Sequence, residues 1–308
     1  MRAVFAASLL AFASPAAAQV CQAWTPSETI GRLDTSLVNE ASGLEASAKF
    51  GDRLYHNNDS GDGLRFYISR LDGQGARVVE VEGAKPIDIE ELSIGPCSQD
   101  GDCLYLGDIG DNPARRDEVV FTLVREVEDF PETVAPLRVI RARYPDGPHN
   151  AEAFAVHPSG DLYLVTKPAD RVMMNPVAAQ VFRLTAAQLR DPSQVQTFEQ
   201  IGEIDLPKIM GSRPFPGSIT TAMDISADGR RVILLTYMAA LELAFDLKDG
   251  LPPNAQWEEG KDYRVVDLEI LPQQEAVAWL PDASGFLYDT ELTRGAQQAP
   301  IRKVACLR

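Results

Sequence analysis

The chain has 308 residues, of which 45 are acidic and 29 are basic, giving a formal net charge of −16 at pH 7. This charge would repel phosphate backbones and therefore argues against nucleic-acid binding, although it is compatible with a hard cation. Hydrophobic residues make up 45% of the sequence, enough for one large core, and no apolar run is long enough to cross a bilayer.

The N-terminal segment, residues 1–18, has the pattern of a secretory signal peptide. Arg2 supplies a positive charge, an apolar stretch follows, and three alanines end at Ala18. We therefore expect a mature domain over residues 19–308 that is periplasmic or secreted.

Four cysteines follow this segment, an even number that fits an oxidising compartment. Cys97 and Cys103 flank a turn-rich stretch between two predicted strands, so we expect them to form a local disulfide. Cys21 and Cys306 lie near the two ends of the mature chain. If they form a disulfide, the ends meet, as a closed ring requires.

A short cassette recurs five times: an acidic or hydroxyl residue, an apolar strand, a turn and a second apolar strand. The cassettes begin at Glu40, Glu90, Glu152, Thr221 and Glu275. Their spacing of roughly fifty to seventy residues is typical of propeller blades. We predict an all-β fold, a single β-propeller with five four-stranded blades, and six blades as the alternative.

The strands of the first repeat are expected at 43–47, 53–56, 64–71 and 77–82. The fifth repeat stops one strand short. Residues 28–37 precede the first cassette and belong to no blade. We expect this segment to complete the last blade, which would close the ring and cover both open edges.

In each blade the head of the first strand and the tail of the second should converge at one mouth of the central channel. Glutamates crowded there repel each other unless a cation compensates their charge. Ca²⁺ accepts about six to eight oxygen ligands, whereas zinc would require thiolates or histidines. We predict a Ca²⁺ site formed by Glu40, Glu90, Glu152, Thr221 and Glu275. The alternative is that each glutamate simply begins a strand and meets solvent.

The strand tails supply candidate catalytic carboxylates. Asp59, Asp108 and Asp111 could position a water, act as a general base or bind a second ion. Aspartate and asparagine are also common turn residues, so a purely structural role is the alternative.

Basic and amide side chains near the same mouth could hold an anionic substrate. The candidates are Asn58, Lys167 and Arg213, although Lys167 and Arg213 could equally neutralise neighbouring carboxylates. His56 and His149 are expected on this face, where a lone histidine is usually only a hydrogen-bonding neighbour. The sequence contains no Gly-x-Ser-x-Gly elbow, P-loop or dinucleotide fingerprint.

With these motifs in place, the chain resembles two groups of proteins. The runs 56–62, 88–91, 107–112 and 144–152 are similar to motifs of an uncharacterised family of secreted bacterial β-propellers. A weaker resemblance is to the calcium-activated nucleotidases (apyrases), which have five blades and hold one Ca²⁺ on the axis.

The nucleotidase resemblance implies ligands in the order hydroxyl, Glu, Glu, hydroxyl, Glu, from which this chain departs at Glu40. It gives Asp59 the acid role, whereas Asp108 and Asp111 stand where that family has glycine and lysine. The extra negative charge disfavours a substrate with several phosphates. The resemblance is therefore a better guide to the fold and the metal than to the substrate.

Two functions remain open at this point. One is a Ca²⁺-dependent hydrolase of phosphate esters or anhydrides, or of related esters such as lactones, acting on a small anionic substrate. The other is a non-catalytic propeller that is stabilised by calcium and binds an extracellular protein or glycan. In both cases we expect a monomer.

Overall fold

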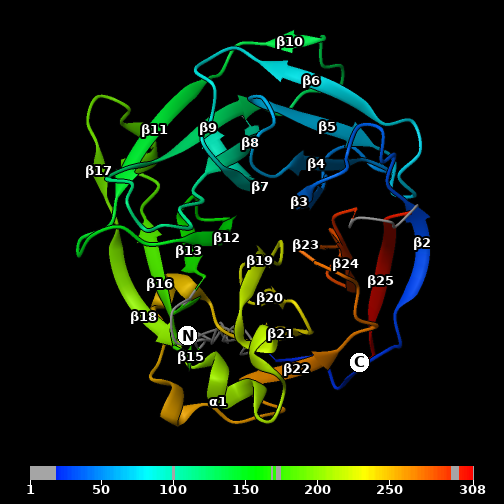
Figure 1. Cartoon of the computed structure of the whole chain (residues 1–308), viewed down its shortest axis with the longest axis vertical. Coiled ribbons are helices and arrows are strands. Elements are labelled where there is room, and N and C mark those ends of the chain that lie inside the picture. Colours follow the sequence, from blue (N-terminus) through cyan, green and yellow to red (C-terminus); the bar gives the residue numbers. More distant parts are fainter. Residues whose placement is uncertain (1–18, 99–100, 168, 171–174, 293–297, 308) are drawn as a thin grey trace, which may run out of the picture.

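The computed structural model describes residues 19–98, 101–167, 169–170, 175–292 and 298–307, so the expected signal peptide lies outside the described residues. In the described residues, five sheets of antiparallel blade strands are arranged around a central axis (Figure 1), and β14 (Ala169–Asp170) and β15 (Asn175–Pro176) form a sixth, two-stranded sheet. The predicted all-β propeller with five blades is therefore confirmed. No helix in the described residues is long and apolar enough to cross a membrane.

The blades are numbered in chain order, and the strands of each blade are given from the axis outward. Blade 1 consists of β3 (Ala41–Ala46), β4 (Leu54–Asn58), β5 (Arg65–Ser69) and β6 (Arg77–Val81), and blade 2 of β7 (Ile89–Ser98), β8 (Gly101–Asp108), β9 (Val119–Arg125) and β11 (Arg138–Arg143). Blade 3 consists of β12 (Ala151–Val156), β13 (Leu162–Thr166), β16 (Ala179–Leu184) and β18 (Glu199–Ile204), and blade 4 of β19 (Thr220–Ile225), β20 (Val232–Thr236), β21 (Ala239–Leu243) and β22 (Tyr263–Asp267).

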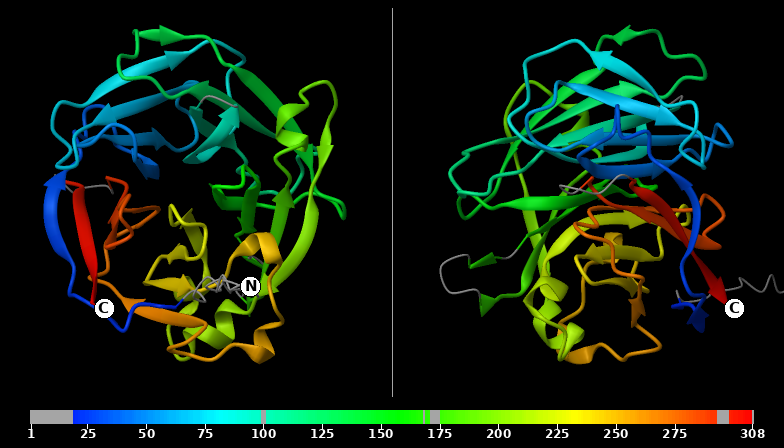
Figure 2. Two further views of the ribbon diagram at one scale, coloured as in Figure 1. Left: turned by 180° about the vertical axis from the view of Figure 1, so that it is seen from behind. Right: turned by 45° about the vertical axis from the view of Figure 1, so that its right-hand side comes forward.

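Blade 5 is built from both ends of the chain. Its inner strands are β23 (Ala276–Trp279), β24 (Gly285–Asp289) and β25 (Pro300–Leu307), and β2 (Glu28–Arg32) pairs antiparallel with β25. Figures 1 and 2 show β2 in blue beside β25 in red. The short strand β1 (Ala23–Trp24) also pairs with β25. The predicted closure by the N-terminal segment is confirmed.

The outer edges of blades 1 and 2 are each covered by a short strand from the chain segment that forms the next blade. The short strand β10 (Thr133–Val134) pairs in parallel with β6, and β17 (Gln196–Thr197) pairs in parallel with β11. An uncovered outer strand would offer unpaired N–H and C=O groups to other chains. These short strands remove that edge from blades 1 and 2.

The hydrophobic core is divided among the five interfaces between neighbouring blades, each with its own cluster of buried apolar side chains. At the interface of blades 2 and 3, for example, the rings of Phe121 and Phe154 meet edge to face with centroids 5.2 Å apart. The alternating β-branched, leucine and aromatic residues of the strands supply these contacts.

The inner edges of the five innermost strands face the axis, where their N–H groups need acceptors. At one level of the channel, three side chains accept one N–H from each of these strands. Glu45 accepts from Ala46 (3.0 Å) and Ile94 (3.3 Å), Ser93 accepts from Val156 (3.1 Å), and Asp224 accepts from Ile225 and Trp279 (both 2.6 Å). Three of these five bonds join neighbouring blades.

Both predicted disulfides are present. Cys21 and Cys306 are bonded across the seam of the ring, with their Cα atoms 5.6 Å apart, and Cys97 is bonded to Cys103. The first bond holds together segments that are 285 residues apart in the sequence.

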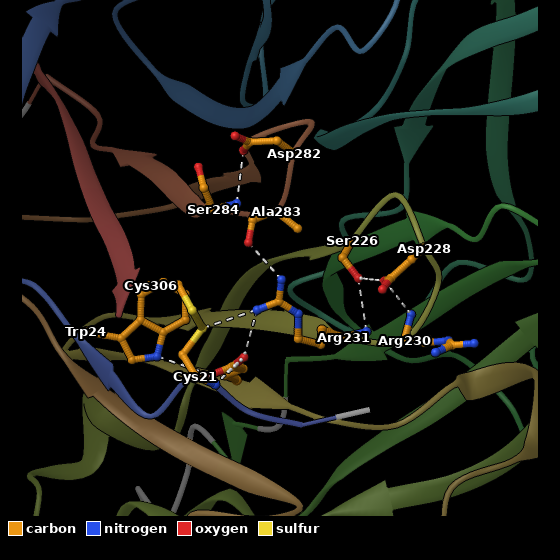
Figure 3. Close-up of polar contacts among 11 residues, drawn as sticks. Cys21, Trp24, Ser226, Asp228, Arg230, Arg231, Asp282, Ala283, Ser284 and Cys306 are labelled. Carbon is orange, nitrogen blue, oxygen red and sulfur yellow. Dashed lines mark hydrogen bonds and ion pairs between the residues drawn. A yellow bond between two sulfur atoms is a disulfide. The ribbon is translucent and has the colours of Figure 1, made fainter. Parts of the chain in front are cut away.

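A buried ion pair supports the seam (Figure 3). Arg231 lies 3.2 Å from Cys21 Sγ and 3.3 Å from a carboxylate oxygen of Glu242, which is fully buried. The same carboxylate accepts from the backbone N–H of Cys21 (3.0 Å) and from Trp24 Nε1 (3.1 Å). Glu242 therefore anchors the N-terminal segment to blade 4.

The Glu242→Gln variant should lose about 3–5 kcal/mol in its free energy of unfolding, because the Arg231 charge stays buried without its counter-ion. Denaturant unfolding monitored by circular dichroism measures this loss. The control is Glu199→Gln, which breaks a largely exposed pair with Arg183 and should cost about 0–1 kcal/mol. Equal losses in both variants would contradict the anchoring role.

Replacing Cys21 and Cys306 together by serine should lower the free energy of unfolding by about 2–5 kcal/mol, because the bond closes a very long loop. The matched control replaces Cys97 and Cys103, whose bond spans a separation of only 6 residues and should stabilise less. The prediction is wrong if the local disulfide contributes as much as the one at the seam.

Candidate functional site

A β-bulge interrupts the head of the innermost strand in four of the blades. In blade 1, Ala41 is paired with Asn58 and Gly43 with Asn57, so Ser42 is left without a partner. The same shift in register leaves Glu90, Glu152 and Thr221 unpaired in blades 2, 3 and 4. Bulges re-aim a side chain and are common beside functional sites. In blade 5, Glu275 takes the corresponding place, immediately before β23.

The register differs from the sequence expectation in the first blade. Ser42, and not Glu40, stands at the position of Glu90 in the next blade. Glu40 lies two residues earlier, before β3, with an exposed side chain. The five equivalent positions therefore carry Ser42, Glu90, Glu152, Thr221 and Glu275.

The two hydroxyl residues in this ring tie adjacent blades together. Ser42 Oγ donates to the carbonyl oxygen of Glu90 at 2.5 Å, and Thr221 Oγ1 donates to the carbonyl oxygen of Gln274 at 3.0 Å. Each bond joins the head of one innermost strand to the head of the next.

Lys167 lies at this mouth, as the sequence predicts, and its ammonium group forms an ion pair with Glu152. It also donates to the hydroxyl of Tyr237 at 3.0 Å, and that hydroxyl donates to Glu275 at 2.6 Å. Burial raises the pKa of Glu152 to about 8, against the opposing effect of Lys167. The Lys167 ammonium group is therefore in contact with both a carboxylate and a tyrosine hydroxyl at this mouth.

The mouth carboxylates gather in two compact groups that share one member. Asp59 lies with Asp88 and Glu90 in one group and with Glu275 and Glu291 in the other, and within each group one oxygen per residue lies within 4.8 Å of the others. Asp59 follows β4 in blade 1, which stands between blades 2 and 5 in the ring (Figure 1). Neither group includes Glu40 or Glu152.

Like charges at the mouth perturb the titration of these carboxyls. Burial, followed by the nearby Asp59, raises the pKa of Asp88 to about 6. Burial and the neighbouring Glu275 raise the pKa of Glu291 to about 9. Burial, reinforced by Glu152, also raises the pKa of Glu90 well above its usual value.

Asp108 and Asp111 are occupied with contacts inside their own blade. The carboxylate of Asp108 accepts from the backbone N–H groups of Ile87 (3.1 Å) and Asp88 (2.9 Å) and pairs with Arg116 at 2.8 Å. Asp111 accepts from the N–H groups of Arg115 (2.6 Å) and Arg116 (2.7 Å). These contacts make Asp108 a positioning residue for Asp88.

The remaining predicted residues are also engaged locally. Asn58 donates to the carbonyl oxygen of Leu37 at 2.9 Å, and Arg213 forms an ion pair with Asp267 on β22, the outermost strand of blade 4. This places the Arg213 guanidinium with an outer strand rather than with the innermost strands that carry the carboxylates.

The histidines do not add titratable groups to the carboxylate mouth. His56 is buried, with Nε2 2.8 Å from Ser69 Oγ and Nδ1 3.9 Å from a carboxylate oxygen of Asp289, at the interface of blades 1 and 5. His56 is therefore a buried hydrogen-bonding neighbour, the role expected for a lone histidine. His149 pairs with Asp146 at 2.8 Å.

Three residues at the mouth were not among the predicted site residues. Asp88, Glu291 and Tyr237 all contact the carboxylate network. A signal for the first two was present, because Asp88 stands two residues before a cassette head and Glu291 lies in a strand tail. Tyr237 likewise lies in a strand tail, that of the fourth repeat.

No protein-family model and no curated protein matches the chain. Among solved structures, it is similar to a putative oxidoreductase (glucose dehydrogenase) from Thermus thermophilus, with 14% identity, 90% of this chain and 99% of that chain covered, and a TM-score of 0.47. For a second glucose dehydrogenase structure the identity is 12%, the alignment covers 91% of this chain and 99% of that chain, and the TM-score is 0.49. A nidogen/laminin complex has 12% identity, coverage of 81% and 72%, and a TM-score of 0.42. Similarity this low transfers no activity, and the propeller assignment comes from the chain's own sheet topology.

Without divalent cations, the stability of the protein should fall as the pH rises. The pKa of Glu291 is raised from its usual 4.5 to about 9, so the folded state keeps a proton that the unfolded chain has released. The stabilisation that protonated Glu291 provides is complete below about pH 4 and is lost as the pH approaches about 9. Urea unfolding in the presence of a chelator, repeated between about pH 5 and 9, should show a shallower fall for Glu291→Gln than for the wild type. Superimposable pH profiles would contradict this assignment.

Proposed function

We propose that the acidic mouth binds Ca²⁺ and that the protein is a calcium-dependent hydrolase of phosphate esters, anhydrides or related esters. The observation that carries the proposal is the convergence of carboxylates from three blades on Asp59. A group of this kind has no purely structural reason to be assembled, because each added carboxylate raises the electrostatic cost of the others.

The residues at the mouth fit a hard cation. Asp88 Oδ1 is buried and has no hydrogen-bond partner. A Cβ atom on Gly110 would lie 2.3 Å from both Asp88 Oδ2 and Glu90 Oε1, so only glycine at this position lets the two carboxylate oxygens lie together against the backbone. All of these ligands are oxygens, as Ca²⁺ prefers, and the four cysteines are tied up in disulfides.

The ring of bulged positions supports the same metal. Ser42, Glu90, Glu152, Thr221 and Glu275 read hydroxyl, Glu, Glu, hydroxyl, Glu in blade order. This is the order that the resemblance to the calcium-activated nucleotidases implies. With Ser42 in place of Glu40, the departure in the first blade disappears.

The chain's own residues have distinct roles in this proposal. Asp59, Asp88 and Glu90 would hold the ion, which when bound polarises a substrate oxygen. Asp59 would also orient the attacking water, and Asp108 keeps Asp88 beside it through the backbone contact of 2.9 Å. Lys167, held between Glu152 and Tyr237, presents the positive charge nearest to the carboxylate groups.

A non-catalytic propeller stabilised by calcium is the second candidate. It is favoured by the charge of the mouth, because Lys167 and Arg116 are already paired with Glu152 and Asp108. A mouth that keeps so many carboxylates would repel an anionic substrate unless cations are bound. In this case the ion would only tie the innermost strands together, and the rim would bind an extracellular protein or glycan.

Calcium should raise the melting temperature of the mature protein, and a chelator should reverse the effect, because the ion binds only the folded mouth. Glu90→Gln combined with Asp88→Asn should weaken Ca²⁺ binding at least about tenfold in calorimetry, since each removes one charged ligand. Glu199→Gln on an outer strand is the control for the loss of a charge. Unchanged affinity in the double variant would contradict the site.

Turnover separates the two candidates. We expect the mature protein to hydrolyse at least one aryl phosphate, nucleotide, phosphoanhydride or lactone with calcium, and none with chelator. Asp59→Asn should reduce this turnover by about 10²-fold or more. Calcium binding without any turnover across this panel would favour the non-catalytic propeller.

A further inference from the structure

The two carboxylate groups at the mouth are arranged on either side of Asp59. Asp88 and Glu90 belong to the head region of blade 2, whereas Glu275 and Glu291 belong to blade 5. Asp59 follows the second strand of blade 1, which lies between them (Figure 1). Asp59 Oδ1 accepts from the backbone N–H of Ser60, and the carboxylate keeps further lone pairs on its two oxygens that are available to both sides.

The five carboxylates do not merge into a single group. Within each group the ligand oxygens lie within 4.8 Å of one another, but no such set in the described residues combines members of blade 2 with members of blade 5 apart from Asp59. Two oxygens bound to the same Ca²⁺ are at most about 5 Å apart, because Ca–O distances are about 2.3–2.6 Å. Each group therefore matches the size of one ion, and together they match the size of two.

Each side also holds a deeply buried carboxylate group. Glu90 is 3% exposed, and its Oε1, like Asp88 Oδ2, lies so close to the backbone of Gly110 that a Cβ atom there would be only 2.3 Å away, while Asp88 Oδ1 is buried without a hydrogen-bond partner. On the other side Glu275 is 6% exposed, and Tyr237 donates to only one of its two oxygens. Buried carboxylate oxygens without donors are costly unless a cation or proton compensates them.

The charges around the mouth leave this compensation incomplete. In the described part of the chain, no lysine or arginine forms an ion pair with any of the five carboxylates. Two basic groups close by form ion pairs with other carboxylates: Lys167 with Glu152, and Arg116 with Asp108. One divalent cation would leave a net charge of −3 on the ionised set, whereas two would leave −1.

We propose that the mouth holds two divalent cations bridged by the carboxylate of Asp59, one bound with Asp88 and Glu90 and the other with Glu275 and Glu291. The proposal rests on the calcium binding proposed above and extends it from one ion to a pair. Carboxylate-bridged pairs of ions are typically about 3.5–4 Å apart and suit a phosphate group, whose oxygens can bind both ions. The substrate class that fits this pair is a phosphate ester rather than a lactone.

The number of bound ions tests the proposal. Calorimetry with Ca²⁺ and native mass spectrometry should find two ions per wild-type chain. Glu291→Gln should weaken the site next to blade 5 by at least about tenfold and leave one ion, and Glu90→Gln should do the same for the site next to blade 2. Asp59→Asn should weaken both. Glu40→Gln is the matched control, because it removes the same charge from the same mouth but lies outside both groups.

Manganese provides a readout that is independent of activity. With Mn²⁺ as the probe, the electron paramagnetic resonance spectrum of the wild type should show two exchange-coupled ions, whereas Glu291→Gln should show the pattern of an isolated ion. Circular dichroism in chelator identifies the variants that fold. If Asp59→Asn does not fold, Glu90→Gln and Glu291→Gln still decide the question.

The outcomes separate this proposal from the one it rests on. One ion per wild-type chain, weakened by Glu90→Gln and Glu291→Gln alike, would overturn the pair and leave the single calcium site standing. Two ions that are both unaffected by Glu291→Gln would overturn the assignment of ligands. Binding of no ion at all would overturn both proposals.

Discussion

The structure depends on satisfying the backbone donors that face the axis of the ring. Each innermost strand has an inner edge without a neighbouring strand, and a buried N–H group without an acceptor costs about as much as a lost hydrogen bond. Glu45, Ser93 and Asp224 accept these N–H groups, and several of the bonds cross from one blade to the next. The channel side chains thus link the blades at the axis, while the apolar clusters pack the blades against each other farther out.

The acidic mouth lies where bulges interrupt regular pairing at the heads of these same innermost strands. Where a bulge leaves Glu90 or Glu152 unpaired, the side chain is freed from the pattern of the sheet and turned toward the opening. Five blades bring several such residues together at once. Burial is the main reason why the pKa values of Asp88, Glu152 and Glu291 are raised, and repulsion between the carboxylates adds to it. Both effects are the physical basis of the cation binding proposed for this mouth. Lys167 relieves the repulsion only on the side of blade 3.

The parts of the fold that depend on periodic patterns could be predicted. Five blades follow from the spacing of the cassettes, and closure of the last blade by the N-terminal segment follows from a missing strand and an unused one. Only part of the candidate site could be predicted from the sequence. Cassette alignment placed Glu40 on Glu90, but the strand pairing of the two blades puts Ser42, two residues later, at that position. A slip of this kind cannot be seen in the sequence, because both residues are polar and lie near the start of the same strand.

The sequence by itself determined the number of blades, the way the ring closes, both disulfides and the face on which acidic residues gather, because all of these follow from repeat period and chain position. Only the tertiary structure decided which acidic residues meet. Asp59, Asp88 and Glu291 come from three blades, and their proximity results from the curvature of the ring. The structure also assigned Asp108 to holding the backbone of Asp88 and Lys167 to Glu152. Contacts between side chains that are far apart in the sequence depend on the packing of whole blades, which no local pattern encodes.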